Sequence, residues 1–438
     1  VNKLAPSLVL VNFDMPYSVS GITERNYYGT GVIVDAERGL VVVDRNTVPV
    51  VIGDVRLTFA GTIEIPGRVE YVHPLHNLAI IAYDPALIGT TPAKAAVFKA
   101  VDLQPGEQVW AVGVRGDGKA QSRMSTVASV DPVAFPLSRT FRFRDTNLET
   151  IQLVNGPGDY DGVLTNRQGE VIATWASFAY EAGREIAQEN RGIPAELILE
   201  MLPLVRGEKT LHSLEAELLP VPLAGARKLG LPDRWIHTLE QHSPDRRQVL
   251  SVSRLVGGSP ASKLLRSGDL ILDIDGTVVN RFREVERAVQ KPQVRITVLR
   301  DGTEQVIEVP TVALGGRDLD RIVVWAGAVL QEPHRALSAQ RGITPDGVFV
   351  GYFSYGSPAT RYQLWAGRRI VEVDGQPTPD LDHFLKAVAG RPDRSSIRLR
   401  TMAWNGSVDV ITLKLDKRYW PTYELKRSAA GWTRTMLD

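Results

Sequence analysis

The sequence of 438 residues contains no cysteine. Disulfide bonds, thiolate metal ligands and a cysteine nucleophile are therefore excluded. An excess of charge of one sign is also missing, because 51 Lys and Arg oppose 50 Asp and Glu and leave a formal net charge of +1. This balance argues against nucleic acid or an anionic membrane as the main partner. No apolar run reaches the roughly 18 residues of a transmembrane helix, so we expect no membrane span.

What is present is ordinary for a globular protein, with 43% hydrophobic and 23% charged residues. A chain of this length predicts two to four domains of about 100–200 residues, each with its own core. The sequence starts "VNKLAPSLVLVNF", with neither Met nor a basic and then apolar signal region. We therefore expect residues upstream of Val1 in the full protein.

Residues 1–190 consist of short β-type runs such as "GTGVIVD", "LAIIAYD" and "EQVWAVGV", separated by Gly, Pro, Asp or Asn. This spacing predicts an all-β domain of sandwich or barrel type. A helical pattern follows, with apolar residues on one face from Ile193 to Val205. We expect residues 1–205 to form the first domain and its linker helix.

An internal repeat occupies most of the remaining chain. "GGSPASKLLRSGDLILDIDGTVV" begins at Gly257 and "YGSPATRYQLWAGRRIVEVDGQPT" at Tyr355. In both copies a β run ends in an Asp-Gly hairpin signal, at Asp275 and Asp374, and an amphipathic helix and further β runs follow. Two α+β modules are predicted, at residues 211–314 and 318–415, with a C-terminal tail at 416–438.

The repeated pattern "GSPA…L..GD.I..IDG" resembles the PDZ domains of HtrA-type (Deg) serine proteases. The resemblance implies an all-β trypsin-like double β-barrel followed by two α+β PDZ domains. In a PDZ domain an extended peptide adds to a sheet edge, and backbone N–H groups hold its C-terminal carboxylate.

Peptide binding is predicted mainly for the second copy, because "VVWAGAVLQ" offers a small-residue turn. The first copy lacks the glycine, and a blocked groove in one or both modules is the alternative. The candidate peptide-binding residues are Trp325, Ala326, Gly327, Ala328, Val329 and His383 in the second copy, and Leu214, Glu215 and Ala216 in the first.

The same resemblance locates a catalytic triad in the first domain, on "GVIVDAERGLVVVDRNTV", "HPLHNLAIIAYD" and "NGPGDYDGVLTNRQGEVI". The His, Asp and Ser positions fall on Asn46, Asn77 and Tyr160. An Asn cannot accept a proton at neutral pH, and a phenol lies further from the backbone than a serine hydroxyl. These three residues predict no triad mechanism.

Residues around Tyr160 correspond to the oxyanion loop, of which Gly158, Asp159 and Asp161 are the remnant. Two carboxylates would oppose a developing negative charge. A carboxylate dyad or a cation loop is one interpretation, but we expect solvated turn carboxylates. Tyr160 itself is expected to plug the former nucleophile pocket rather than to act as a new functional group.

Two histidines, His73 and His76, stand in "HPLH". The functional interpretation of this pair is a displaced general base or half of a metal site. Their spacing across a proline lacks the geometry of a helical metal pair, and no third ligand is apparent. We expect surface or capping histidines, and no metal or other cofactor.

A narrower resemblance covers nearly the whole chain, through "WAGAVLQEPHRA", "YWPTYELKR" and "LTFAGTIEIPGRVEYVHPLHNLAIIAYDP". These stretches are similar to the C-terminal, degenerate protease–PDZ half of the tandem fungal nuclear and plant HtrA-like proteases and their bacterial relatives. The resemblance implies a catalytically inactive pseudoprotease, not an enzyme, that regulates or scaffolds protein quality control. The alternative is the inactive half of an HtrA-like serine endopeptidase whose active domain lies upstream.

The partners that this resemblance implies are peptides or unfolded polypeptides, an active HtrA-like protease domain in cis or in trans, and further copies of the chain in a trimer. Nucleic acid is not expected. For a bacterial member the resemblance implies a periplasmic or other extracytoplasmic location.

Overall fold

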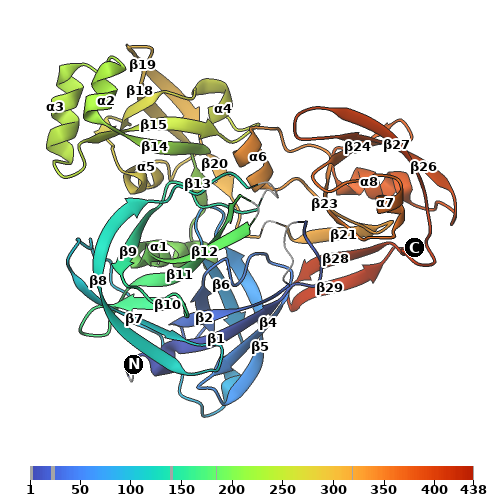
Figure 1. Cartoon of the computed structure of the whole chain (residues 1–438), viewed down its shortest axis with the longest axis horizontal. Helices are drawn as coiled ribbons and strands as arrows, with labels where there is room; N and C mark the ends of the chain where they lie inside the picture. Colours follow the sequence, from blue (N-terminus) through green and yellow to red (C-terminus); the bar gives the residue numbers. More distant parts are fainter. Residues whose placement is uncertain (1–2, 21–24, 139–141, 184, 318, 438) are drawn as a thin grey trace.

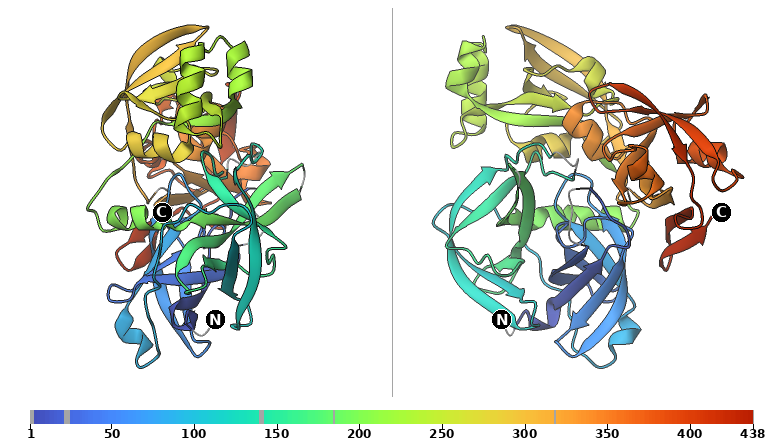
Figure 2. Two further views of the ribbon diagram at one scale, coloured as in Figure 1. Left: turned by 90° about the vertical axis from the view of Figure 1, so that its left-hand side faces the viewer. Right: turned by 45° about the vertical axis from the view of Figure 1, so that its right-hand side comes forward.

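The computed structural model describes residues 3–20, 25–138, 142–183, 185–317 and 319–437. The domain limits predicted at residues 1, 318 and 438 lie outside these ranges. Two barrels stand side by side in the lower half of Figure 1, one module lies above them, and a second module lies beside the first barrel. The other views in Figure 2 show the same grouping.

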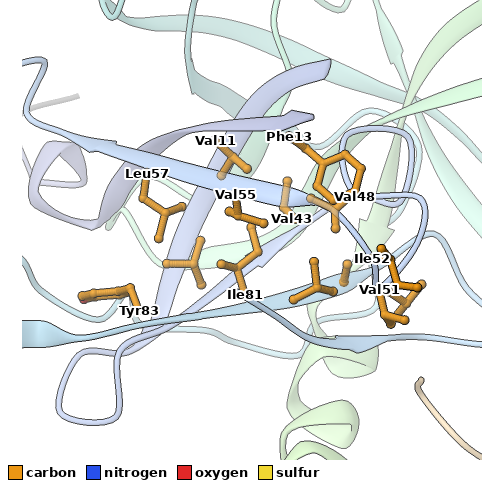
Figure 3. Close-up of a cluster of buried hydrophobic side chains, with 14 of the residues drawn as sticks. Val11, Phe13, Val43, Val48, Val51, Ile52, Val55, Leu57, Ile81 and Tyr83 are labelled. Atoms are coloured by element: carbon orange, nitrogen blue, oxygen red, sulfur yellow. The ribbon is translucent and has the colours of Figure 1, made fainter. Parts of the chain in front are cut away.

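Six strands close the first barrel in the order β1-β2-β3-β6-β5-β4. They are β1 (Leu8–Asp14), β2 (Asn26–Asp35), β3 (Leu40–Val43), β4 (Asp54–Phe59), β5 (Ile63–Val72) and β6 (Ala79–Tyr83), with short 3-10 turns at Ala5–Ser7 and Pro85–Ile88. Successive side chains of a strand point to opposite faces, so every second apolar residue enters the interior. Figure 3 shows Val11, Leu57 and Ile81 converging there.

The second barrel closes in the order β10-β11-β12-β9-β8-β7. Its strands are β7 (Gln108–Val114), β8 (Ala120–Pro132), β9 (Glu149–Val154), β10 (Gly162–Thr165), β11 (Val171–Ala182) and β12 (Glu185–Pro194). The predicted double barrel is thus confirmed. Helix α1 (Ala195–Val205) follows directly and buries Leu197, Ile198 and Met201.

The first module contains a sheet in the order β14-β15-β16-β18-β19, in which β14 is an edge strand. Its elements are β13 (Leu211–Ser213), β14 (Ala216–Pro222), α2 (Leu223–Lys228), α3 (Asp233–His242), β15 (Gln248–Leu255), α4 (Ala261–Leu264), β16 (Leu270–Ile274), β17 (Thr277–Val278), α5 (Phe282–Ala288), β18 (Gln293–Arg300), β19 (Thr303–Pro310) and β20 (Val312–Leu314). Strand β13 pairs separately with β20. The helix pair α2–α3, between β14 and β15, was not predicted; in the second module the single helix α6 (Arg335–Arg341) takes the corresponding place between β22 (Ala328–Gln331) and β23 (Val348–Phe353).

The second module has a longer sheet, in the order β27-β26-β24-β23-β22-β21-β28-β29. Its elements are β21 (Arg321–Trp325), β22 (Ala328–Gln331), α6 (Arg335–Arg341), β23 (Val348–Phe353), α7 (Pro358–Arg361), β24 (Arg369–Val373), β25 (Gln376–Pro377), α8 (Leu381–Val388), β26 (Ser396–Met402), β27 (Val408–Lys414), β28 (Tyr423–Ser428) and β29 (Gly431–Met436). Residues 416–438 were expected to be a tail, but β28 and β29 extend this sheet.

Both predicted Asp-Gly turns have the backbone that hairpins favour. The φ angles are +54° and +80° at Asp275 and Gly276, and +48° and +83° at Asp374 and Gly375. Positive φ at both central residues is the signature of a type I′ turn. The helices expected after each turn are α5 and α8. The two modules therefore share the predicted local chemistry.

Candidate functional site

Two of the three predicted triad positions meet on one strand. The side-chain amide of Asn46, which follows β3, donates to Ser177 Oγ at 2.9 Å, and that of Asn77, which precedes β6, donates to the Ser177 carbonyl at 2.7 Å. Asn77 Oδ1 in turn accepts the backbone N–H of Arg45 at 2.7 Å. Asn46 and Asn77 belong to the first barrel and Ser177 to β11 of the second, so these amides join the barrels.

The third position points elsewhere. Tyr160 is 9% exposed, and its ring lies in the core of the second barrel. Its hydroxyl donates to the Ala111 carbonyl at 3.2 Å, and burial raises its pKa. The loop before it is fixed by Trp175, whose indole N–H donates to the Pro157 carbonyl at 2.9 Å. The phenol therefore fills the space beside β7 and does not face the two asparagines.

The two carboxylates that flank Tyr160 have different environments. Asp159 is exposed and pairs with Arg115, as expected of a solvated turn residue, and Gly158 next to it is exposed too. For Asp161 that prediction is wrong, because its Oδ1 accepts the backbone N–H of Thr30 at 2.7 Å in the interior.

Asp161 is half-buried and forms a carboxyl pair with the buried Asp44. Burial, and then the charge of Asp44, raise the pKa of Asp161 well above its usual range. Burial also raises the pKa of Asp44, although the backbone N–H groups of Ser177 and Thr47 donate to it at 2.8 Å each. Two such carboxyls cannot both ionise cheaply, so the pair holds a proton more tightly than an isolated Asp does.

The two histidines are buried, so the expectation of surface residues is wrong, whereas the capping alternative agrees with the contacts of His73. His73 is 3% and His76 is 1% exposed. His73 Nδ1 accepts the backbone N–H groups of Leu75 and His76, and burial followed by the nearby His76 lowers its pKa well below the ordinary value. His73 is thus a neutral structural residue.

His76 connects the first barrel to the first module. Its Nε2 lies 3.0 Å from both carboxylate oxygens of Glu286 on α5. Burial alone would raise the pKa of Glu286, but His76 and Arg283 outweigh it and hold this pKa well below its usual range. Arg283 also pairs with Glu196 of α1 at 3.0 Å. The "HPLH" segment is therefore half of an interdomain ion network.

The geometry that the structure describes does not provide nucleophilic catalysis at the triad positions. Nucleophilic catalysis requires a proton acceptor within hydrogen-bond reach of the nucleophile. From the first barrel the Asn46 amide reaches Ser177 Oγ, and it acts as a donor there. Among the described residues no group of three His, Cys, Asp or Glu could hold a metal ion.

In the second module the predicted peptide turn is a hairpin turn. Ala326 and Gly327 have φ of +51° and +81°, and Trp325 pairs with Ala328 across them. A Cβ on Gly327 would lie 2.2 Å from Ser357 Cβ, which explains the need for glycine. Val329 is buried in β22, whose two edges are taken by β21 and β23.

Strand β21 lies between β22 and β28, and its Trp325 ring meets Phe384 of α8 edge-on, with 5.2 Å between centroids. His383, at the start of α8, is exposed and bonded to Asp380. In the part of the chain that the structure describes, β21 and β22 have a neighbouring strand on both sides, so peptide binding at 325–329 gains no support from this arrangement. It stays a prediction, one that requires β21 to leave β22.

In the first module the corresponding strand does have an edge without a neighbouring strand, since among the described strands β14 pairs only with β15. Leu214 is buried in the module core, while Glu215 has φ of +58°. The Glu215 carboxylate is 5% exposed and accepts the Arg335 guanidinium of α6 at 2.9 and 3.0 Å. Ala216 begins the edge strand.

A cavity of about 200 Å³ lies where the barrels and both modules meet. Asn46 and Asn77 line it from the first barrel, Phe178 from the second, and Ala216 and Arg335 from the two modules. Two of the predicted triad positions, Asn46 and Asn77, thus open onto the same space as the start of β14.

Sequence reasoning missed Ser177 and the segment 144–147, of which Ser177 and residues 144–146 also line this cavity. Ser177 had a weak signal, as a polar residue inside the apolar run "EVIATWASF". Segment 144–147 had none, because its partners lie about 70 residues further along the chain, as the hydrogen bond between Asn147 and Ala216 shows.

No helix within the described ranges is both long and apolar enough to cross a membrane.

Two families match parts of the chain. The trypsin-like peptidase domain matches residues 29–173, and the PDZ-like domain matches residues 319–394. Both matches agree with the predicted resemblance. A solved structure, the HtrA-type protease AlgW with tripeptide, superposes with a TM-score of 0.50 at 19% identity, over 73% of this chain and 97% of that one. At this identity the likeness supports the fold alone.

Similar proteins extend over nearly the whole chain. Protease Do-like 7 of Arabidopsis thaliana is 37% identical over 482 residues, which cover 99% of this chain and 44% of the relative. The pro-apoptotic serine protease nma111 of Aspergillus clavatus is 30% identical over 453 residues, covering 100% of this chain and 44% of the relative. The chain therefore spans less than half the length of these relatives.

These relatives overturn the prediction that the protein is not an enzyme. They are named as serine proteases, and a peptidase domain family covers residues 29–173. The prediction failed because it extended the chemistry of three positions in one domain to the whole protein. The chain combines a trypsin-like peptidase domain with a PDZ-like region and is homologous to the HtrA-type proteases Protease Do-like 7 and Nma111.

Proposed function

We propose that the protein is an HtrA-type serine endopeptidase, in which residues 1–438 form the polypeptide-binding and regulatory half. The nucleophile would come from a trypsin-like domain outside these residues, in the same chain or in a partner chain. The observation that carries the proposal is the pair Asn46 and Asn77 on Ser177, which keeps the frame of a triad without its base.

Two further observations support this division of labour. The relatives named as proteases are more than twice as long as the part that this chain matches. The cavity beside Asn46 and Asn77 is continuous with the edge of β14, so an extended polypeptide held in the first module would lie near these two triad positions. Unfolded polypeptides are the expected substrates, in a protein quality-control role.

The test compares the product of the complete reading frame with residues 1–438 alone. Both are given unfolded casein and a serine-directed fluorophosphonate probe, and the labelled peptide is located by mass spectrometry. We expect the complete product to cleave casein and to carry its label outside residues 1–438. Absence of cleavage by the complete product refutes the endopeptidase, and a label within residues 1–438 refutes the assignment of the nucleophile.

A further inference from the structure

The edge of β14 in the first module is covered by one side chain of the second barrel. Asn147, in the loop between β8 and β9, donates its amide N–H to the Ala216 carbonyl at 2.8 Å. Its Oδ1 accepts the backbone N–H of Leu218, also at 2.8 Å. A strand that added to this edge would satisfy the same two backbone groups, since an edge strand presents unpaired N–H and C=O groups to any partner.

The same loop also supplies a charge to this edge. Arg144 pairs with Glu217, the residue between the two that Asn147 contacts, and both side chains are largely buried. Glu217 has a second, more exposed partner in Arg254 at 3.4 Å. The loop therefore places an amide on the backbone of β14 and a guanidinium on Glu217. An added polypeptide strand with a basic residue would make the same two kinds of contact.

The acidic side chains around β14 decide what kind of ligand fits. Glu215 stands at the turn before β14, where a free carboxylate would have to bind, and Arg335 already pairs with it. A second carboxylate beside Glu215 and Glu217 would be repelled, because like charges at short range are destabilising. The edge suits an internal segment, and Glu217 favours a basic residue in it.

We propose that the edge of β14 is a binding site for an internal, extended, basic segment of a polypeptide, and that Asn147 and Arg144 occupy it in the closed state. Occupation is exclusive, because Ala216 and Leu218 each offer one outward backbone group to Asn147 or to the ligand. The cavity beside Arg144 and Ala216 provides the room through which such a segment can enter. The site rests on the polypeptide binding of the proposed function but not on endopeptidase activity.

The matched variants are Asn147→Gly and Asn155→Gly. Both asparagines have φ of +54°, a conformation that glycine adopts without strain, so neither substitution is expected to disturb the backbone. Asn155 is exposed and remote from β14, which makes it the control. The probe is a fluorescent peptide of Val and Thr with a central Arg, acetylated and amidated at its ends, and binding to the whole chain is followed by polarisation.

Asn147→Gly is expected to bind this peptide at least about tenfold more tightly than the unsubstituted chain, because two competing hydrogen bonds are gone. Asn155→Gly is expected to bind as the unsubstituted chain does. A peptide with Glu in place of Arg is expected to bind more weakly, and Glu217→Gln in the Asn147→Gly background should abolish this preference. Equal affinities of the Asn147→Gly and unsubstituted chains, or binding that requires a free C-terminal carboxylate, overturn the proposal.

Hydrogen exchange gives a second readout. The Leu218 amide should exchange faster in Asn147→Gly and be protected again by the peptide, while amides of β16 and β18 stay unchanged. If the Leu218 amide stays protected in Asn147→Gly without peptide, Asn147 is not what covers the edge. Since polarisation and exchange need no catalysis, failure of the casein assay leaves both results interpretable.

Discussion

Replacing Asp145 by Asn should remove a loss of unfolding free energy that grows as the pH rises. Asp145 is 5% exposed, and within the described residues its Oδ1 has no hydrogen-bond partner. Burial raises its pKa to about 7, although His76 and Arg45 act in the opposite direction. The uncharged amide of Asn has nearly the same shape and cannot ionise.

The magnitude follows from the pKa values of Asp145 in the two states. An unfolded Asp titrates near 3.9, so the folded chain holds the proton more tightly until the pH exceeds about 7. The contribution of protonated Asp145 to the unfolding free energy is fully present below about pH 4 and is lost as the pH rises through the folded pKa. The difference between the pKa of Asp145 in the unfolded and in the folded chain corresponds to about 4 kcal/mol of unfolding free energy.

Urea unfolding of the unsubstituted chain and of Asp145→Asn, followed between pH 4 and pH 8, measures this difference. The free-energy gap between them should change by about 4 kcal/mol over that range, in favour of the variant at high pH. The exposed Asp159 serves as the control, since Asp159→Asn should give no pH-dependent gap above pH 5. Parallel pH profiles for Asp145→Asn and the unsubstituted chain would refute the reasoning.

Three further predictions concern other parts of the chain. Tyr160→Ser should open a cavity and lower the unfolding free energy by about 3–5 kcal/mol. The variant should still not react with a fluorophosphonate, because Asn46 provides no base, and labelling of the new serine would contradict this. Glu286→Gln should leave His76 and Arg283 without their buried anion and lower stability by about 3–5 kcal/mol. This loss should shrink as the pH falls below about 4, because the unfolded chain then protonates Glu286 while the folded chain still holds its pKa well below the usual range. Thermal melts between pH 3 and pH 7 would check the onset. Phe13→Ala, in the core of the first barrel, should lower the unfolding free energy by about 3–5 kcal/mol, and a change below 1 kcal/mol in urea titrations would show that the core had collapsed around it.

Local patterns were the part of the fold that the sequence could predict. The barrels follow from short apolar runs separated by turn residues, and the Asp-Gly turns follow from a backbone preference that acts within four residues. The repeat then identified two modules with similar helices. Even the meeting of Asn46 and Asn77 followed from a known frame, although their common partner Ser177 did not.

Long-range burial was the part that it could not predict. The pair "HPLH" looked like a surface segment, because the Glu286 that covers His76 lies 210 residues away. Ala326-Gly327 suited a carboxylate loop or a hairpin turn equally well, since both need positive φ, and only the pairing of β21 with β22 decides between them. Asn147 carried no signal, because its partner strand is in another domain.

The place of β21 sets an order of assembly for the second module. Strand β21 is flanked on one side by β28, and Ile322 pairs with Leu425 across roughly a hundred residues of intervening chain. During synthesis the module cannot complete its sheet until residues 423–436 have emerged, and until then β21 exposes an open edge to other chains. The second module therefore stays prone to aggregation until its last two strands are made, and a ribosome that stalls after β27 would leave the edge of β21 open.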